Sequence, residues 1–407
     1  MVYNLCILLY DLLVHIAALF GGKARLLVKG HRQVFSTLSA KIQPTKRYVW
    51  FHAASLGEFE QGRPLIERLR KQDPTMGIVL TFFSPSGYEV RKHYEGADVV
   101  CYLPFDRPCH VRQFIGMVKP TAAFFIKYEF WKNYLDELHR RGVDTYSISS
   151  VFRPNQVFFQ WWGRRYSKVL LNFTRLFVQN EASKTLLANI GVDRVSVVGD
   201  TRFDRVLEIH RASKELPIVE AFKGEQLTIV AGSTWPADED LLIDYFNHHP
   251  EVKLIIAPHV ISQSHIDQIT RKLTRPWVRY TQVQASQAKE AHCLIIDCFG
   301  LLSSIYRYGE IAYVGGGFGA GIHNTLEAAV YGIPVVFGPN HKHFREAIGL
   351  LQAGGAFAIT DATSLDHALT PLLNNPQLLN NAGQQAGRYV AGNVGATEAI
   401  LKELNIN

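Results

Sequence analysis

The chain has 407 residues, of which 47% are hydrophobic and 19% are charged, and its formal net charge is +7. This length is comfortable for two globular domains, and the composition describes an ordinary globular interior. The five cysteines leave one without a partner and show no paired-ligand spacing: Cys6, Cys101, Cys109, Cys293 and Cys298. A disulfide framework is therefore disfavoured, and a reducing compartment is expected.

The N-terminal segment is strongly apolar from Leu5 to Phe20 but carries Asp11 and His15. After Asp11 no acidic residue appears until Glu58, and the lysines and arginines between them form a basic stretch. Positive charge follows the apolar run instead of preceding it, unlike in a signal peptide. We expect residues 1–30 to be a retained membrane anchor with a basic collar for anionic lipid headgroups. An apolar first helix packed on the protein body is the alternative; no nucleic-acid motif is present, so no nucleic-acid partner is expected.

Short apolar runs alternate with helical patterns through the rest of the chain, which predicts parallel sheets covered on both faces. Expected strands are 48–53, 78–83, 99–103, 122–126, 145–148, 176–179 and 195–198, then 227–231, 252–257, 293–296, 311–314, 334–337 and 356–359. Between the two series, the polar stretch 206–224 contains Pro217 and indicates a hinge or linker. We predict an α/β protein with two doubly wound, Rossmann-like domains, residues 31–210 and 225–407, with ligands bound in a cleft between them beyond the carboxyl ends of the strands.

A glycine-rich loop follows the strand expected at 311–314 and leads into a helical pattern that ends at Gly332. Five of the seven residues from Gly315 to Gly321 are glycine, which suits a backbone that approaches a ligand closely. Unpaired N–H groups at a helix N-terminus bind phosphate well, so the loop is a candidate phosphate site. Asn324 and Glu327 also have the spacing of a capping box, so a purely structural helix start is the alternative. A dinucleotide fingerprint would open the first strand–helix unit, so nicotinamide or flavin binding is disfavoured.

Polar residues also follow other expected strands. Ser55 and Glu58 come directly after the strand at 48–53, where Glu58 is a candidate general base; a capping box is again the alternative. Ser233 and Thr234 end the first strand of the second series, where they could cap a helix or bind phosphate.

A dense aromatic cluster follows Pro154: Phe158, Phe159, Trp161 and Trp162. We expect it to pack in the core or between domains, with contact to acyl chains or the membrane surface as the alternative.

An ordered set of motifs resembles the family of 3-deoxy-D-manno-octulosonic acid (Kdo) transferases, which have the GT-B architecture. The set begins with residues 52–58, similar to the family's Ser-x-Gly-Glu motif, and spans nearly the whole chain. The other matching segments are 80–81, 86–87, 102–106, 129–133, 198–204, 231–234, 315–317, 321–327 and 338–339 with Phe344. These enzymes are inverting glycosyltransferases that move Kdo from CMP-Kdo to a lipid A precursor, at the cytoplasmic face of the bacterial inner membrane.

The resemblance implies that Glu58 is the base that deprotonates the lipid A sugar hydroxyl, and that no metal or other cofactor is needed. It implies that the donor is bound by Ser233, Thr234, His259, Gly315, Gly316, Gly317, Gly321, His323, Asn324 and Glu327, with Glu327 on the ribose. The acceptor side is implied to include Ser55, Gly57, Glu129, Arg153 and Arg202. A structural Glu129 paired with Arg153 or Arg202 is the alternative.

Two points qualify this assignment. The family's Pro-Arg-His segment is Pro258-His259-Val260 here, so the arginine expected to face the nucleotide phosphate is missing. A soluble sugar-nucleotide epimerase of the same architecture, or a GT-B glycosyltransferase with another acceptor, is the rival function. An epimerase has no use for an apolar N-terminus followed by a basic stretch.

Overall fold

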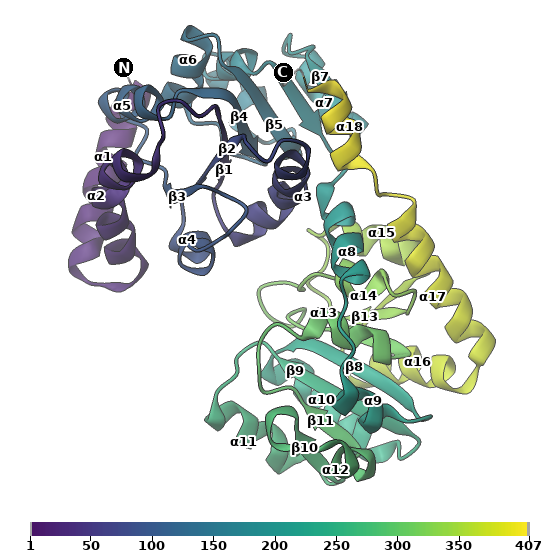
Figure 1. Cartoon of the computed structure of the whole chain (residues 1–407). Helices are drawn as coiled ribbons and strands as arrows, with labels where there is room; N and C mark the ends of the chain where they lie inside the picture. The colour runs from purple at the N-terminus through teal and green to yellow at the C-terminus, as the bar shows by residue number, and fades with distance from the viewer. Residues whose placement is uncertain (1, 405–407) are drawn as a thin grey trace. The chain divides into compact units, whose positions relative to one another are not determined.

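The structure is a computed structural model that describes residues 2–404. Its described residues divide into two compact units: those up to Arg205 together with those from Gly395 onward, and those from Val206 to Val394. Each unit contains one seven-stranded parallel sheet with helices around it (Figure 1). The expected α/β class with two doubly wound domains is confirmed.

The first sheet has the strand order β3-β2-β1-β4-β5-β6-β7. Its strands are β1 (Tyr48–Ala53), β2 (Gly77–Phe82), β3 (Val99–Tyr102), β4 (Pro120–Ile126), β5 (Asp144–Ser150), β6 (Arg175–Val178) and β7 (Val195–Val197). Every residue of β1 and β2 is buried, because helices cover both faces of a parallel sheet. All seven strands lie within a few residues of their expected positions.

The helices of the first unit are α1 (Val2–Leu19), α2 (Gly22–Lys41), α3 (Leu56–Gln72), α4 (Pro85–Arg91), α5 (Pro108–Val118), α6 (Lys132–Arg140), α7 (Glu181–Ala188) and α18 (Ala396–Glu403). Three short 3-10 turns, η1 (Val157–Phe159), η2 (Trp161–Gly163) and η3 (Ser167–Asn172), lie between β5 and β6. Helix α8 (Thr201–Arg211) carries the chain from the first unit into the second.

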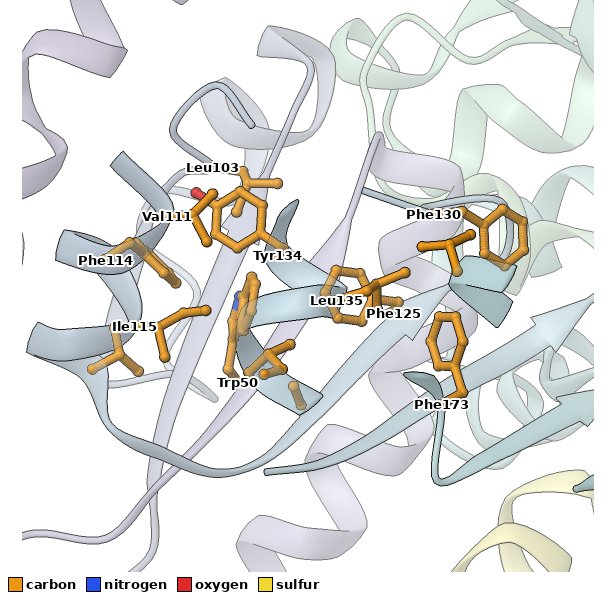
Figure 2. Packing of buried hydrophobic residues seen from close by; sticks show 14 of the residues in the cluster. Trp50, Leu103, Val111, Phe114, Ile115, Phe125, Phe130, Tyr134, Leu135 and Phe173 are labelled. Atoms are coloured by element: carbon orange, nitrogen blue, oxygen red, sulfur yellow. The ribbon is translucent and has the colours of Figure 1, made fainter. Parts of the chain in front are cut away.

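Trp50 of β1 lies at the centre of the larger core cluster of the first unit, as Figure 2 shows. Its ring packs against Phe114 of α5 and Phe125 of β4, at centroid distances of 5.0 and 5.1 Å. The indole nitrogen donates to Thr81 Oγ1 at 2.8 Å, so this large buried ring also has its polar atom satisfied. The core thus fixes β1, the strand that leads to Glu58.

Helices α1 and α2 form an antiparallel pair at the N-terminus (Figure 1). Among the described residues, α1 is the one helix whose length and mean hydropathy of 1.9 would allow it to cross a membrane, and 11% of it is buried. The following α2 packs into the core through Leu27, Val34 and Leu38. Within residues 22–30, expected to belong to the anchor segment and its basic collar, Leu27 and Val28 are buried, whereas Lys23, Arg25 and Lys29 are exposed.

The second sheet has the order β10-β11-β9-β8-β12-β13-β14. Its strands are β8 (Leu227–Thr234), β9 (Val252–Pro258), β10 (Trp277–Arg279), β11 (Cys293–Ile295), β12 (Ile311–Val314), β13 (Val335–Phe337) and β14 (Ala356–Ala358). The helices are α9 (Pro217–Lys223), α10 (Pro236–His248), α11 (Gln263–Lys272), α12 (Ala285–Glu290), α13 (Leu302–Ile305), α14 (Leu326–Ala329), α15 (Arg345–Gln352), α16 (Ala362–Asn374) and α17 (Pro376–Ala391). Two 3-10 turns complete the unit, η4 (Tyr280–Gln282) and η5 (Tyr306–Tyr308).

Three expectations need correction. The short edge strand β10 was not expected, since three residues give too little pattern to detect. The stretch 206–224 is not an extended linker: it holds the end of α8 and all of α9, with Val206, Val219 and Phe222 buried in the second unit.

The chain end is the third correction, because residues 395–404 pack on the first unit instead of the second. Asp204 accepts the backbone N–H groups of Gly395 and Thr397, both at 2.6 Å. Glu403 pairs with Arg175 at 2.8 Å, and Ile400 is fully buried. The last helix therefore returns to the first unit.

Candidate functional site

Both sheets have a topological switch point, where the strand order reverses direction. It lies between β1 and β4 in the first unit and between β8 and β12 in the second. Ligands of doubly wound sheets bind beyond the carboxyl ends of the strands at such points. Glu58 and Glu129 follow β1 and β4, whereas Ser233 and the glycine-rich loop lie at the ends of β8 and β12. The sequence-predicted residues thus gather at the switch point of each unit.

Glu58 lies in the first turn of α3 and is partly exposed. Ser55 is the N-cap residue, but its side chain makes no hydrogen bond to the helix backbone. Instead the Ser55 hydroxyl donates directly to the Glu58 carboxylate. The capping-box alternative is therefore wrong here, and Glu58 is not used to close its own helix. Gly57 beside it is exposed.

Glu129 is held by a buried polar chain that begins inside the sheet. Its carboxylate accepts from His52 Nε2 at 3.0 Å and from Trp131 Nε1 at 2.6 Å. An ionised carboxylate only accepts hydrogen bonds, so Nε2 of His52 carries a proton. Nδ1 of His52 lies 2.9 Å from Thr81 Oγ1, which in turn accepts from Trp50. Glu129 thus has a fixed orientation, and its partners are not the arginines considered as the alternative.

Arg202 and Arg153 lie close enough to Tyr128 to influence its ionisation. Burial raises the pKa of Tyr128, the two arginines lower it, and Asp200 and Glu58 raise it again. Arg202 is anchored to Asp200, with Nε and a terminal nitrogen 2.9 and 2.8 Å from Oδ2. Arg153 has an exposed side chain. The first unit therefore presents a mixed group of charges around Tyr128, with Glu58 among them.

At the end of β8 in the second unit, the buried side chains of Thr234 and Glu239 form a hydrogen bond. Thr234 is fully buried, and its hydroxyl donates to Glu239 Oε1 at 2.9 Å, while Oε2 of Glu239 lies 2.8 Å from His265 Nε2. The Thr234 hydroxyl proton is therefore not free for a phosphate. Ser233 adopts a left-handed backbone with φ of +53°, and the N-cap of α10 is Trp235. Neither Ser233 nor Thr234 caps a helix, so that expectation is wrong.

Asp238 ties the ends of β8 and β12 together. One oxygen of this fully buried carboxylate accepts from the backbone N–H groups of Trp235 and Gly316, both at 2.9 Å. The other accepts from the Tyr313 hydroxyl at 2.8 Å. A buried carboxylate with three donors is well satisfied, and it fixes the start of the glycine-rich loop.

The glycine-rich loop folds tightly on the unit's own backbone. A Cβ on Gly315 would lie 2.4 Å from the Ser233 carbonyl oxygen, and one on Gly317 would lie 2.6 Å from Gly338 Cα. Gly316 and Gly321 have φ of +91° and +145°, which favours glycine. The glycines are thus required by internal packing, a reason that composition alone does not reveal.

Four of the seven N–H groups from Gly315 to Gly321 have partners within the unit. Gly315 donates to Gly232, Gly316 to Asp238, and Gly321 to Gly316. Within residues 2–404, the N–H groups of Gly317, Phe318 and Ala320 have no acceptor. The helix that follows, α14, has only four residues, so it supplies no long helix dipole.

Asn324 and Glu327 interact directly, but not as a capping box. The Asn324 amide donates to Glu327 Oε1 at 3.0 Å, and its oxygen accepts from the Leu326 N–H at 3.2 Å. The N-cap is Thr325, whose side chain makes no capping hydrogen bond. Glu327 remains partly exposed beside the loop.

Three rings stack at the edge formed by β8, β9 and the glycine-rich loop. His259 lies between Trp235 and His323, with centroid distances of 4.8 and 4.5 Å. Trp235 Nε1 donates to His323 Nε2 at 3.1 Å. Burial, and then the nearby His259, lower the pKa of His323, so this ring is neutral near pH 7. His259 and Trp235 are both exposed on one side, which leaves a flat aromatic surface.

Sequence reasoning missed His52, Thr81, Trp235 and Asp238. Two of them had a detectable signal, because His52 and Thr81 are polar residues inside otherwise apolar strands, and buried polar groups need partners. Among residues 2–404 no group of three or more His, Cys, Asp or Glu side chains has the geometry to hold a metal ion.

Residues 29–205 match the family described as 3-deoxy-D-manno-octulosonic-acid transferase (kdotransferase). The chain is also 28% identical over 339 residues to the 3-deoxy-D-manno-octulosonic acid transferase of Aquifex aeolicus, covering 81% of this chain and 87% of the relative. The Bordetella pertussis transferase is 26% identical over 383 residues, covering 89% and 87%. The likeness to these transferases thus extends through both units.

Solved structures share the architecture at low identity. UDP-GlcNAc 2-epimerase from Neisseria meningitidis, bound to UDP-GlcNAc, has a TM-score of 0.60 at 15% identity, covering 88% of this chain and all of the other. An Anabaena protein in complex with UDP and glucose has a TM-score of 0.56 at 11% identity, covering 88% and 98%. These likenesses establish the fold, which is of the GT-B type. By the family match over residues 29–205 and the curated relatives at 28% and 26% identity, the chain is similar to the 3-deoxy-D-manno-octulosonic acid transferases.

Proposed function

We propose that this protein transfers Kdo from CMP-Kdo to a sugar hydroxyl of a lipid A precursor, in lipopolysaccharide core biosynthesis. The observation that carries the proposal is the position of Glu58: it lies inside the stretch that matches the family, at the switch point of the first sheet, and it is not consumed by its own helix. A partly exposed carboxylate there can take a proton from an acceptor hydroxyl.

The reaction is a single displacement with inversion. The acceptor oxygen forms a bond to the anomeric carbon of Kdo, the bond from that carbon to the CMP phosphate breaks, and the hydroxyl proton goes to Glu58. Before this step, the Ser55 hydroxyl holds the Glu58 carboxylate in place. Glu129, fixed by His52 and Trp131, and the arginines near Tyr128 bind the polar head of the acceptor.

The second unit binds the donor. The Gly317 N–H and the Asn324 amide are the donors for the phosphate, and Glu327 accepts from the ribose hydroxyls. His259, stacked between Trp235 and His323, takes the place of the arginine that the family has at this position. Fixed N–H groups stabilise the charge that develops on the leaving phosphate. We expect no metal requirement, so excess EDTA should leave the rate unchanged. The protein acts at the cytoplasmic face of the bacterial inner membrane.

The test is incubation of full-length protein with a tetraacylated lipid A precursor and CMP-Kdo generated in place, followed by mass spectrometry of the lipid. A gain of one or more Kdo units is expected. Glu58→Gln should lower the rate by about 10²- to 10⁴-fold, the usual range for a lost general base, while CMP binding survives. Glu181→Gln, at an exposed carboxylate in the first turn of α7, is the matched control and should keep the rate.

Two results would count against the proposal. If no Kdo is added although CMP binds, the acceptor is another molecule. If the protein instead binds UDP better than CMP and interconverts UDP-linked sugars without any lipid, it is an epimerase of the same fold.

A further inference from the structure

The aromatic segment around η2 is exposed, which corrects the expectation that it packs in the core. Trp161 and Trp162 are 88% and 61% exposed, whereas Phe158 just before them is buried. Exposed tryptophans in adjacent positions are costly in water, and they usually mark a contact with a partner or a membrane. Arg164, Arg165 and Lys168 follow directly and are also exposed.

The charge of this segment is one-sided. After Asp144, no acidic residue appears until Glu181, and this stretch carries basic residues throughout. The N-terminal pair α1 and α2 also combines a long acid-free sequence with exposed apolar side chains and basic residues. The outward side of α1 exposes leucines such as Leu5, Leu12 and Leu13, and α2 exposes Lys23, Arg25, Lys29 and Arg32.

The two regions are joined through α1. Tyr3 stacks on Tyr166 at a centroid distance of 5.8 Å, and Tyr166 stacks on Phe158 at 5.5 Å. The segment with Trp161 and Trp162 is therefore anchored beside the start of α1, and the two exposed apolar surfaces adjoin.

Helix α1 itself is fastened along its length to the first unit. Tyr3 donates to Asp106 at 2.6 Å, the Asn133 amide donates to Asn4 at 2.9 Å, and Arg107 pairs with Asp11 at 3.2 Å. A helix that crossed the bilayer would need about 20 apolar residues within the hydrocarbon. Residues 3–11 cannot enter it while these contacts hold. Helix α1 in this arrangement suits a position along the membrane surface, with its apolar side buried at the headgroup boundary.

We propose that Trp161 and Trp162, with Arg164, Arg165 and Lys168, form a second contact with an anionic bilayer that acts together with the apolar side of α1. Tryptophan rings favour the headgroup level of a bilayer, and arginines beside them attract anionic lipids. This proposal rests on the proposed function in one respect: the proposed function identifies the membrane as the bacterial inner membrane. Its test contains neither donor nor acceptor, so its failure and a failure of Kdo transfer are distinguishable.

The test uses full-length protein and vesicles of phosphatidylcholine with and without phosphatidylglycerol, some carrying brominated acyl chains that quench nearby tryptophans. Wild-type fluorescence should be quenched on the anionic vesicles. The Trp161→Phe/Trp162→Phe variant keeps apolar rings and should still bind, but most of the quenching should disappear. Trp277→Phe, which removes a 40% exposed tryptophan from the second unit, is the control and should keep the quenching.

Binding strength gives the second readout. Trp161→Ala/Trp162→Ala should weaken vesicle binding by about tenfold or more, as expected for the loss of buried apolar area. Arg164→Gln/Arg165→Gln should weaken binding by about tenfold on anionic vesicles alone. Circular dichroism checks that these surface variants are folded. If quenching persists in the phenylalanine variant, or if the alanine variant binds as wild type does, the segment is not a membrane contact.

Discussion

The two switch points use the same topology in different ways. In the second unit, buried carboxylates hold the strand ends: Asp238 binds the loop backbone, and Glu239 binds Thr234. In the first unit, the carboxylates Glu58 and Glu129 are themselves partly exposed and are held by side chains behind them. A rigid backbone surface suits a nucleotide, whereas oriented side chains suit proton transfer. In the proposed function, nucleotide binding therefore falls to the second unit and proton transfer to the first.

The largest expected loss of stability is in the second unit, where the backbone around Gly315 is packed too closely to admit a side chain. Gly315→Ala places a methyl group 2.4 Å from the Ser233 carbonyl oxygen, which cannot move without disturbing β8. We expect a loss of about 3 kcal/mol of stability, in the range for overpacked sites. Hydrogen exchange of peptides from the second unit, measured by mass spectrometry, reports this unit separately.

Gly319→Ala is the matched control, because its nearest neighbour would be 3.7 Å away and its backbone is not left-handed. Gly319→Ala should change the stability of the second unit, as measured by hydrogen exchange, by less than about 0.5 kcal/mol. Equal effects of the two substitutions would mean that the loop is not a packed backbone element, and the contrast between the units would fail.

A smaller effect is expected in the first unit, where Thr81→Val cuts the polar chain behind Glu129. Trp50 Nε1 loses its acceptor and His52 Nδ1 loses the Thr81 hydroxyl, and buried polar groups without partners are destabilising by about 2 kcal/mol. Faster hydrogen exchange should appear in β1 and β2, with a lower rate of transfer. Thr45→Val, at an exposed position just before β1, is the control. If hydrogen exchange in β1 and β2 is unchanged in the Thr81→Val variant, the orientation of Glu129 does not depend on the hydrogen bonds of Thr81.

The sequence predicted the strands far better than the sites. Thirteen of the fourteen strands were expected close to their observed bounds, because strands buried on both faces are continuous apolar runs, such as Tyr48–Ala53. Only β10, an edge strand of three residues, was missed. The return of α18 to the first unit was also missed, since a pairing such as Glu403 with Arg175 leaves no local pattern.

The candidate site was harder to predict because its polar residues could either cap a helix or face a ligand. Ser55 with Glu58 and Asn324 with Glu327 both have capping-box spacing, and neither forms one. Only side-chain geometry separates a cap from a direct pair of side chains. The glycine-rich loop follows the strand expected at 311–314, as predicted, but four of its seven N–H groups are used internally, and spacing cannot show which groups are satisfied.

The smallest expected effect concerns two histidines, one in each unit, whose ring nitrogens differ in their hydrogen bonding. His265 in the second unit bonds to Glu239 and to the Val260 carbonyl. His31 in α2 has both ring nitrogens buried without a partner within residues 2–404, and its ring packs edge-on against Phe105 at 4.2 Å. Burial, followed by the nearby His110 and His15, lowers the pKa of His31 to about 3.

The sign of the pH effect follows from this shift. Unfolded chains bind a proton at His31 near its ordinary pKa of about 6.5, whereas the folded protein resists protonation until about pH 3. Stability of the first unit should therefore fall by about 1 kcal/mol for each pH unit below 6.5. His31→Phe should remove this part of the slope, as measured by hydrogen exchange of α2 and β3 peptides at pH 7 and 5. His343→Phe, at an exposed histidine of the second unit, is the control. If His31→Phe left the slope of the first unit unchanged, His31 would have a partner in solution, and the contrast with His265 would disappear.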